Sequence, residues 1–231
     1  MPAPGQSTSP ANPVLMRSLE ELINTDDPAL PFVVETVEAV PGRCVMHPPS
    51  AAAAEALHRC QVTTRSPMGA IVYQSGGITV LDGWLRILGS GSAAIPRSLP
   101  EWNEGRSSGF YLVADDAFGG FFALDGGALG PGKGEVFYFS PRSLEWVGLE
   151  CTYSQFLVWA CSDFRGFYDD MIWPGCESVI AGLGADRCLF FWPPLWTAEC
   201  VLPPGEVRDV PVAEAWGFQM DMARQLGAEG Q

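Results

Sequence analysis

The sequence predicts an α+β fold in which a central antiparallel sheet is flanked by helices at both ends of the chain. Three apolar or aromatic runs between residues 110 and 146 are separated by two turn-forming segments rich in Asp and Gly, a pattern typical of a β-meander. Apolar residues recur at helical spacing before residue 60 and again after residue 152. Strands and helices do not alternate along the chain, so a sheet built from βαβ units is not expected.

The N-terminal part predicts a short tail followed by helices. Residues 1–12 are rich in Pro, Ser and Ala and are expected to be disordered, whereas residues 13–231 are expected to form a single α+β domain. Asn12 is a good N-cap residue and Pro13 a good first helical residue, so order is expected to begin there. The helices expected before the sheet cover residues 13–24, 32–40 and 50–60.

Short β-favouring runs begin after Gly69 and predict the sheet. Ser75-Gly76-Gly77 and Asp82-Gly83 separate the first runs and are strong hairpin signals. The segment 89–109 is rich in turn residues, with one helical turn expected over 99–103, and ordered loops of this length are more often functional than idle. The expected strands cover residues 70–74, 78–81, 84–88, 110–114, 120–124, 135–140 and 144–147.

Helices are expected again after the meander. Thr152 is a good N-cap for an amphipathic helix whose stripe includes Phe156, Leu157 and Ala160. Further helices are expected at about 164–172, 176–183 and 211–226. The apolar stretch between the last two is interrupted by Pro, and we interpret it as a connection within the same domain.

Composition excludes several classes of protein. Hydrophobic residues make up 47 % of the chain against 17 % charged residues, so a folded core is expected and global disorder is not. The 27 acidic and 13 basic residues give a formal net charge of −14, which would repel a phosphate backbone, so nucleic-acid binding is not expected. No apolar run is long enough for a membrane span, and the N-terminus lacks the basic and apolar regions of a signal peptide.

Seven Cys and two His limit the chemistry further. The number of Cys is odd and the residues lie in apolar surroundings, which favours reduced thiols in a cytoplasmic protein. His47 and His58 are the only histidines and no CxxC is present, so a zinc site is not expected. Nucleophilic catalysis by Ser or Cys usually needs a His base, and neither His accompanies a G-x-S-x-G elbow.

The carboxylates that border the meander turns are the first candidate site: Asp115, Asp116, Asp125 and Glu135. Two such oxygens within a few ångström would hold Mg²⁺ or Ca²⁺, although their spacing matches no EF-hand loop. Asp and Gly are also the best turn formers, so a structural role explains the same residues. No metal or cofactor is therefore predicted, and the turns are expected to show their negative charge to solvent.

The 89–109 segment supplies the second candidate. Trp102 lies in an irregular stretch and is expected to be partly exposed, with Arg97 and Arg106 beside it in the sequence. An enzyme that acts on a small molecule or needs a metal would place its site here, with Asp115 or Asp116 converging on one of these arginines. The Gly89-Ser90-Gly91-Ser92 run lacks the Lys of a phosphate-binding loop and favours a structural turn.

Several segments in this order resemble a bacterial family called domain of unknown function 2625. The resemblance covers nearly the whole chain from about Leu15 and is carried by GWLRILGSG, LPEWN, DDAFGGFFALDGGALG, GEVFYFSPRSLEW, YSQFLVW and PLWT. The family implies no activity that can be carried over to this chain.

A looser similarity is to the SUKH superfamily, whose members share an α+β fold with helices around an antiparallel sheet. The matching pieces are residues 134–139 and 153–157, although this chain is longer at both ends. The similarity implies an immunity protein that neutralises a bacterial toxin. Asp115, Asp116, Asp125, Trp102 and Arg106 would then form the binding surface for a basic partner such as that toxin.

We therefore expect a non-enzymatic protein-binding module. Two alternatives stay open: the small-molecule or metal-dependent enzyme with a site between the 89–109 loop and the acidic turns, and a structural module that oligomerises through its aromatic C-terminal part.

Overall fold

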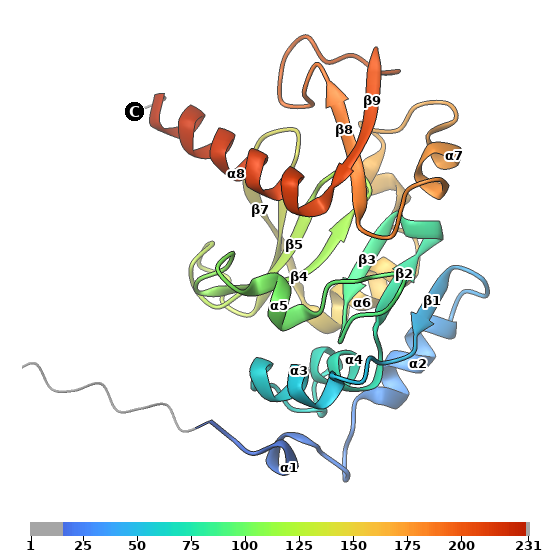
Figure 1. The fold of residues 1–231 in the computed structure, drawn as a ribbon, viewed down its shortest axis with the longest axis vertical. Helices are drawn as coiled ribbons and strands as arrows, with labels where there is room; N and C mark the ends of the chain where they lie inside the picture. The colour runs from blue at the N-terminus through green and yellow to red at the C-terminus, as the bar shows by residue number, and fades with distance from the viewer. Residues whose placement is uncertain (1–15, 230–231) are drawn as a thin grey trace, which may run out of the picture.

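The computed structural model describes residues 16–229, so the expected tail over 1–12 and the helix start at Asn12-Pro13 lie outside the described residues. Seven antiparallel strands form one sheet in which each strand pairs with the next along the chain (Figure 1). The strands are β1 (Cys44–His47), β2 (Gly77–Val80), β3 (Leu85–Leu88), β4 (Phe110–Asp116), β5 (Phe121–Asp125), β6 (Glu135–Ser140) and β7 (Glu145–Thr152). The α+β prediction with a central antiparallel meander is confirmed.

Helices precede and follow this sheet. The N-terminal helices α1 to α4 lie together at one end of the molecule, below the strands in Figure 1. Short 3₁₀ helices, η1 (Leu81–Gly83) and η2 (Arg165–Tyr168), connect longer elements. The α-helices are α1 (Leu19–Leu22), α2 (Leu30–Glu38), α3 (Ala53–Cys60), α4 (Pro67–Gln74), α5 (Leu99–Asn103), α6 (Tyr153–Cys161), α7 (Cys176–Ala181) and α8 (Val212–Glu229).

One predicted strand is wrong. The run 70–74 lies in helix α4, because the hydroxyl of Ser66 accepts a hydrogen bond from the N–H of Gly69 and Pro67 occupies the first helical position. The strand that pairs with β2 at the edge of the sheet is instead β1, which the sequence did not predict. Two other elements are shorter than expected: α1 is a single turn that begins after Ser18, and the helix expected at 164–172 is only the short η2.

Both faces of the meander are covered. Phe122 in β5 packs against Phe156 of α6, with ring centroids 5.0 Å apart. Its neighbour Phe121 points to the opposite face and packs against Trp216 of α8, with ring centroids 4.9 Å apart. Side chains alternate between the two faces of a strand, so a run without polar residues requires cover on both.

A second, two-stranded sheet was missed from the sequence. β8 (Arg187–Trp192) and β9 (Glu206–Pro211) pair as an antiparallel hairpin within the stretch that we interpreted as a connection. The hairpin stands at the end of the molecule opposite α1 to α4, and α8 runs from its base (Figure 1). Leu189 of β8 donates its N–H to the carbonyl of Ala117, 2.7 Å away, which joins the hairpin to the end of β4.

The Gly-Ser run after β3 is a structural turn. A Cβ on Gly89 would lie 2.5 Å from the backbone N of Gly77, so only glycine allows these two segments to approach. The hydroxyl of Ser90 donates to the carbonyl of Ser75 at 2.8 Å and accepts from the N–H of Ser50 at 2.9 Å. The hydroxyl of Ser90 thus joins the turn after β3 to the segments at Ser50 and Ser75.

Candidate functional site

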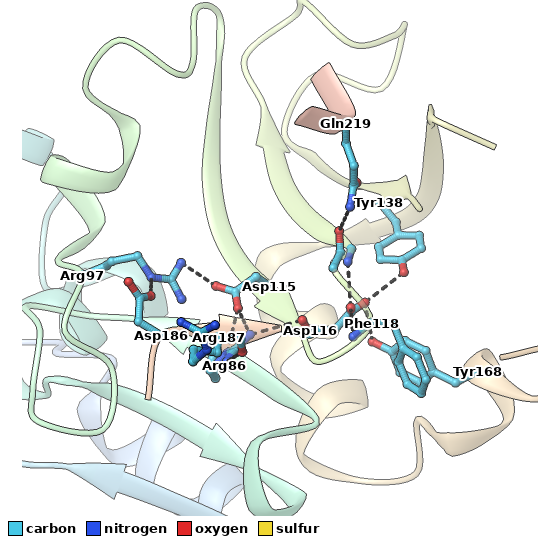
Figure 2. Close-up of polar contacts among 12 residues, drawn as sticks. Arg86, Arg97, Asp115, Asp116, Phe118, Tyr138, Tyr168, Asp186, Arg187 and Gln219 are labelled. Atoms are coloured by element: carbon cyan, nitrogen blue, oxygen red, sulfur yellow. Dashed lines mark hydrogen bonds and ion pairs between the residues drawn. The ribbon is translucent and has the colours of Figure 1, made fainter. Parts of the chain in front are cut away.

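Asp115 and Asp116 are consecutive in β4 and therefore point to opposite faces of the sheet. Asp115 pairs with Arg86 of β3 on one side and with Phe121 of β5 on the other, so these three side chains share one face. Asp116 lies on the face that carries Tyr138. The two carboxylates thus do not form the close oxygen pair that a shared cation would need, and Figure 2 shows the two carboxylate groups with different partners.

Asp115 is bound by two arginines. Arg86 donates from Nε to Oδ1 at 2.7 Å, and Arg97 donates from Nη1 to Oδ2 at 2.8 Å. Arg97 also forms an ion pair through Nε with Asp186 (Figure 2). We call Arg86, Arg97, Asp115 and Asp186 the arginine–aspartate cluster. Its two cations and two anions balance, which is the condition under which buried charges are tolerated.

The arginine–aspartate cluster also reaches the C-terminal hairpin. Arg86 donates from Nη1 to the carbonyl of Arg187 at 2.6 Å and from Nη2 to the carbonyl of Asp116 at 3.2 Å. Asp186 immediately precedes β8, so its ion pair with Arg97 acts on the same junction. The cluster therefore connects β3, β4 and the loop before α5 to the start of the hairpin.

Asp116 sits in a separate cluster of hydrogen-bond donors. Oδ1 accepts from the backbone N–H groups of Phe118 at 2.9 Å and Gly120 at 2.8 Å. Oδ2 accepts from the hydroxyls of Tyr138 at 2.9 Å and Tyr168 at 3.1 Å (Figure 2). The carboxylate thus holds the β4–β5 turn, β6 and η2 together.

The pKa values of the two carboxyls are shifted in opposite directions. Burial alone would raise the pKa of Asp115, but the charges of Arg86 and Arg97 outweigh it and hold this pKa below its usual value. Burial raises the pKa of Asp116 to about 6, although Gly120 and two tyrosine hydroxyls donate to it.

Burial contradicts the expectation that the acidic turns are open to solvent. Asp115, Asp116 and Asp125 are 1 %, 0 % and 2 % exposed. Asp125 accepts the N–H groups of Gly127, Ala128 and Leu129 at 2.9, 2.8 and 3.0 Å, so its carboxylate orders the turn after β5. Both oxygens of Asp115 and of Asp116 are engaged by internal donors, whereas Asp125 uses Oδ1 for the turn and its Oδ2 is buried without a hydrogen-bond partner in the described part of the chain.

Trp102 is also buried, at 3 % exposed, and the expectation of an exposed Trp102 was wrong. Helix α5 carries it, and its ring stacks on Phe121 with centroids 6.4 Å apart. The guanidinium carbons of Arg97 and Arg106 lie 4.6 and 4.4 Å from its ring centroid. Asp115, Arg97, Trp102 and Arg106 are thus brought together as the enzyme alternative requires, but within packed structure and not around an open pocket.

A hollow of about 230 Å³ lies beside the arginine–aspartate cluster, lined by Arg86 together with Thr79, Ile180 and Leu183 among others. Asp115 and Asp116 do not line it. Among residues 16–229 no group of three or more His, Cys, Asp or Glu side chains is placed to hold a metal ion. Glu135, the fourth carboxylate of the first candidate site, is the first residue of β6 and belongs to no such group. Asp115 and Asp116 are almost fully buried, so a molecule in this hollow would contact Arg86 and neither carboxylate.

The hairpin and α8 carry an exposed group of aromatic side chains. Trp192 is 62 % exposed and Phe218 is 44 % exposed. Phe190 and Trp196 are half-buried, and their rings lie 5.6 and 5.8 Å from that of Phe218. Phe190 and Trp192 also line one open hollow of about 260 Å³. We call Phe190, Trp192, Trp196 and Phe218 the aromatic face.

The individual residues of the aromatic face were not predicted, although one alternative placed an oligomerising surface in the aromatic C-terminal part. The sequence pointed to Trp102 as the partly exposed tryptophan, whereas Trp102 is buried and Trp192 is open to solvent. The signal was period-two alternation in the run RCLFFW, in which Leu189 and Phe191 point inward and Phe190 and Trp192 outward. This alternation has meaning only if the run is a strand, whereas the prolines that follow it led us to interpret the stretch as a connection.

No helix within residues 16–229 is both long and apolar enough to cross a bilayer. A match to a family model shows which family the chain belongs to. The model of the family described as "Protein of unknown function DUF2625" matches residues 19–214. The chain belongs to the DUF2625 family. The match extends from α1 into the first turn of α8, so it includes the arginine–aspartate cluster and three of the four residues of the aromatic face.

Two relatives of this DUF2625 chain are bacterial proteins. The chain is 38 % identical over 212 residues to the putative uncharacterized protein YbfG of Escherichia coli strain K12, which covers 90 % of this chain and 97 % of that protein. It is 36 % identical over 189 residues to an uncharacterized protein of Haemophilus influenzae, which covers 78 % of this chain and 83 % of that protein. No solved structure matches the chain, and the similarity to the SUKH superfamily stays a prediction.

Proposed function

We propose that the chain is a non-enzymatic protein-binding module whose aromatic face holds a basic protein partner. The exposure of Trp192 carries this proposal, because a strand places this large aromatic side chain in solvent at 62 % exposure. Trp and other aromatic side chains are enriched at the centres of protein interfaces and supply much of their binding energy. A group of four such side chains on one surface is typical of a binding site.

The charge around the aromatic face supports a basic partner. Glu214 and Asp221 lie four residues before and three residues after Phe218 on α8, so all three share one side of the helix. Glu206 lies opposite Trp192 in the hairpin register. Glu206 is paired with Arg208 and Asp221 with Arg224, whereas Glu214 makes no ion pair with any residue in the described part of the chain. With a formal net charge of −14, such a rim would attract a partner rich in Lys and Arg.

A narrower form of the proposal is that the basic partner is a toxin that this chain neutralises. It rests on the similarity of residues 134–139 and 153–157 to SUKH proteins. In that case the aromatic face would take the place that the sequence assigned to Asp115, Asp116 and Asp125, whose carboxylates are buried.

Binding is better supported than catalysis. Asp115 and Asp116 are the best candidates for acid–base chemistry, yet both are enclosed and all their hydrogen-bonding oxygens are engaged with internal donors. A general base must reach the proton of a bound substrate. The arginine–aspartate cluster instead holds the start of the hairpin in place, and Gln219 joins α8 to the β4–β5 turn, as a rigid binding surface requires.

Site-specific photo-crosslinking in the native bacterium tests the proposal. A photoreactive amino acid at Trp192 is expected to capture a basic protein, whereas the same probe at Val158 of α6, which is 46 % exposed, is not. With the captured protein purified, Trp192→Ala and Phe218→Ala should each weaken binding by about tenfold or more, and Val158→Ala should leave it unchanged.

Salt and stoichiometry separate the alternatives. The affinity for a basic partner should fall as sodium chloride rises from low to high concentration, since the charge attraction is screened. A salt-indifferent complex, or equal capture from both probe positions, would overturn the proposal. Capture of a second copy at Trp192, together with a dimer mass in light scattering, would establish the oligomerising alternative instead.

A further inference from the structure

A hollow lies at the edge of the meander, between its last strand β7 and helix α6. Its volume is about 400 Å³, and it is lined by Leu149, Cys151, Gln155, Trp159 and Phe167. This volume lies in the range of pockets that hold small molecules. None of the side chains that line it within residues 16–229 is charged, in a chain whose formal net charge is −14. The hollow therefore favours a neutral occupant.

An irregularity in β7 forms one wall of this hollow. Between two neighbouring pairs of the β6–β7 register, β7 covers four residue steps, from 148 to 152, whereas β6 covers two. Glu150, in the middle of this stretch, has a φ of 52°, in the left-handed region that residues with a Cβ rarely adopt. Leu149 and Cys151 flank it and line the hollow. Bulges of this kind occur preferentially next to functional sites, where they redirect side chains.

The aromatic walls are held in fixed positions. The rings of Trp159 and Phe167 meet at an interplanar angle of 81°, with centroids 5.3 Å apart. Phe167 packs against Tyr138 and Tyr168, whose ring centroids lie 4.8 and 5.1 Å away. The hydroxyls of both tyrosines donate to the buried Asp116. A wall that is fixed before binding loses little conformational entropy when a ligand packs against it.

Gln155 supplies a hydrogen-bond donor to the hollow. Its Oε1 accepts from the N–H and the hydroxyl of Thr152, at 2.9 and 3.0 Å, so the capping box of α6 fixes the amide. Its Nε2 donates to no protein group within residues 16–229 and is left for a ligand. Cys151 is half-buried and burial raises the pKa of its thiol, so it serves as a wall and not as a nucleophile.

We propose that this hollow binds a small neutral molecule with a planar ring system and one hydrogen-bond acceptor. The ring packs into the corner between Trp159 and Phe167, where one aromatic face and one aromatic edge are available to it. The acceptor receives a hydrogen bond from Nε2 of Gln155. A phosphate or carboxylate does not fit, because no cation lines the hollow in the described part of the chain. The hollow shares no residue with the aromatic face, so this inference is independent of the protein-binding proposal.

Alkylation of Cys151 reports whether the hollow is occupied. The full-length reduced chain is treated with N-ethylmaleimide at about pH 8.5, and peptide mapping by mass spectrometry gives the rate at each cysteine. Quinoline, a neutral two-ring molecule with one acceptor, should slow the reaction at Cys151 about tenfold when present at about ten times its Kd. Cys200 is also half-buried but does not line the hollow, so its rate should not change.

Gln155→Glu separates the hydrogen bond from the ring contact. Glutamate preserves the capping box, since Glu and Gln both serve at this position, but its carboxylate has no N–H to donate. The affinity for quinoline should therefore fall about threefold to tenfold. Naphthalene has the same shape and no acceptor, so it should protect Cys151 equally well in both proteins. Equal losses for quinoline and naphthalene would overturn the role of Gln155 as the donor.

Leu149→Trp should fill the hollow and abolish protection, with circular dichroism as the check that the variant is folded. Absence of protection in the wild-type chain, or equal slowing at Cys151 and Cys200, would overturn the proposal. Tighter protection by N-acetyl-tryptophan amide than by indole would assign the hollow to a side chain of another protein and would overturn it as well. If Leu149→Trp does not fold, the wild-type rates with quinoline still decide the question.

Discussion

Asp115 is the anion shared by two buried arginines, Arg86 and Arg97. Neutralising its carboxylate removes a negative charge from beside two buried guanidinium groups that water does not solvate. Breaking a buried ion pair from one side costs far more than the pair itself contributes. The sequence presented this residue as a surface turn carboxylate, because nothing in a single strand shows which cations will lie opposite.

Asp115→Asn is therefore expected to lower the free energy of unfolding by about 3 to 5 kcal/mol, measured by urea denaturation. The matched control is Asp170→Asn, which breaks the exposed ion pair with Arg142 and should cost less than about 1 kcal/mol. Equal effects of the two substitutions would mean that the arginine–aspartate cluster does not carry the stability assigned to it.

Asp116 predicts a pH dependence of stability. Its pKa is raised to about 6 in the folded protein, above the value near 3.9 of an unfolded chain, so the folded state binds this proton more tightly. This contribution to stability is absent at pH 7 and grows as the pH falls through 6. Asp115, whose pKa is lowered, acts oppositely: its contribution is present above about pH 4 and is lost below it.

The free energy of unfolding should thus rise by about 1 kcal/mol between pH 7 and pH 5, and fall again below about pH 4. Denaturant titrations at stepped pH measure it. In Asp116→Asn, the part of the rise that belongs to this carboxyl should disappear. A wild-type curve that declines steadily from pH 7 to pH 5 would contradict the assignment.

Among the elements, the hairpin of β8 and β9 depends most on contacts from elsewhere. Arg86 donates to the carbonyl of Arg187, Leu189 donates to Ala117, and Gln219 of α8 donates to the carbonyl of Gly119 at 3.0 Å. An isolated two-stranded hairpin is at most marginally stable in water. These junctions therefore decide whether the aromatic face exists as a defined surface.

Arg86→Met is expected to loosen this hairpin before it affects the rest of the sheet, since Asp115 keeps Arg97 as a partner. Hydrogen exchange measured by mass spectrometry should show faster exchange in residues 187–211, with β5 and β6 little changed. Arg142→Met, which removes an exposed ion pair, is the control and should leave the hairpin protected. Uniform acceleration across both sheets would show that Arg86 supports global stability only.

Helix α6 shows an element that the sequence did predict. Thr152 accepts from the N–H of Gln155 while Gln155 accepts from the N–H of Thr152, a capping box that local sequence specifies. Helix α4 shows the opposite case, in which β-favouring residues 70–74 are helical. There the Ser66 cap and the buried surroundings outweigh the weak β preference of Ile, Val and Tyr.

At the scale of the whole molecule, the net charge of −14 affects stability as well as recognition. Many acidic residues on the surface repel one another in the compact state. The free energy of unfolding should therefore rise by on the order of 1 kcal/mol when sodium chloride is added to a few hundred millimolar, as the repulsion is screened. Sodium acetate should give the same rise, and a fall with both salts would mean that attractive surface pairs dominate.

The sequence by itself determined the α+β class, the meander and most helices, because periodicity, turn residues and caps act between near neighbours. Its motifs also carried the resemblance to the DUF2625 family, to which the chain belongs. Only the tertiary structure decided what the candidate residues do. Asp115, Asp116 and Asp125 are buried, Trp102 is packed between arginines, and Trp192 is exposed. Each of these outcomes depends on segments far away in the chain, such as Arg86, Tyr168 and Gln219, and burial is a property of that assembly rather than of local sequence.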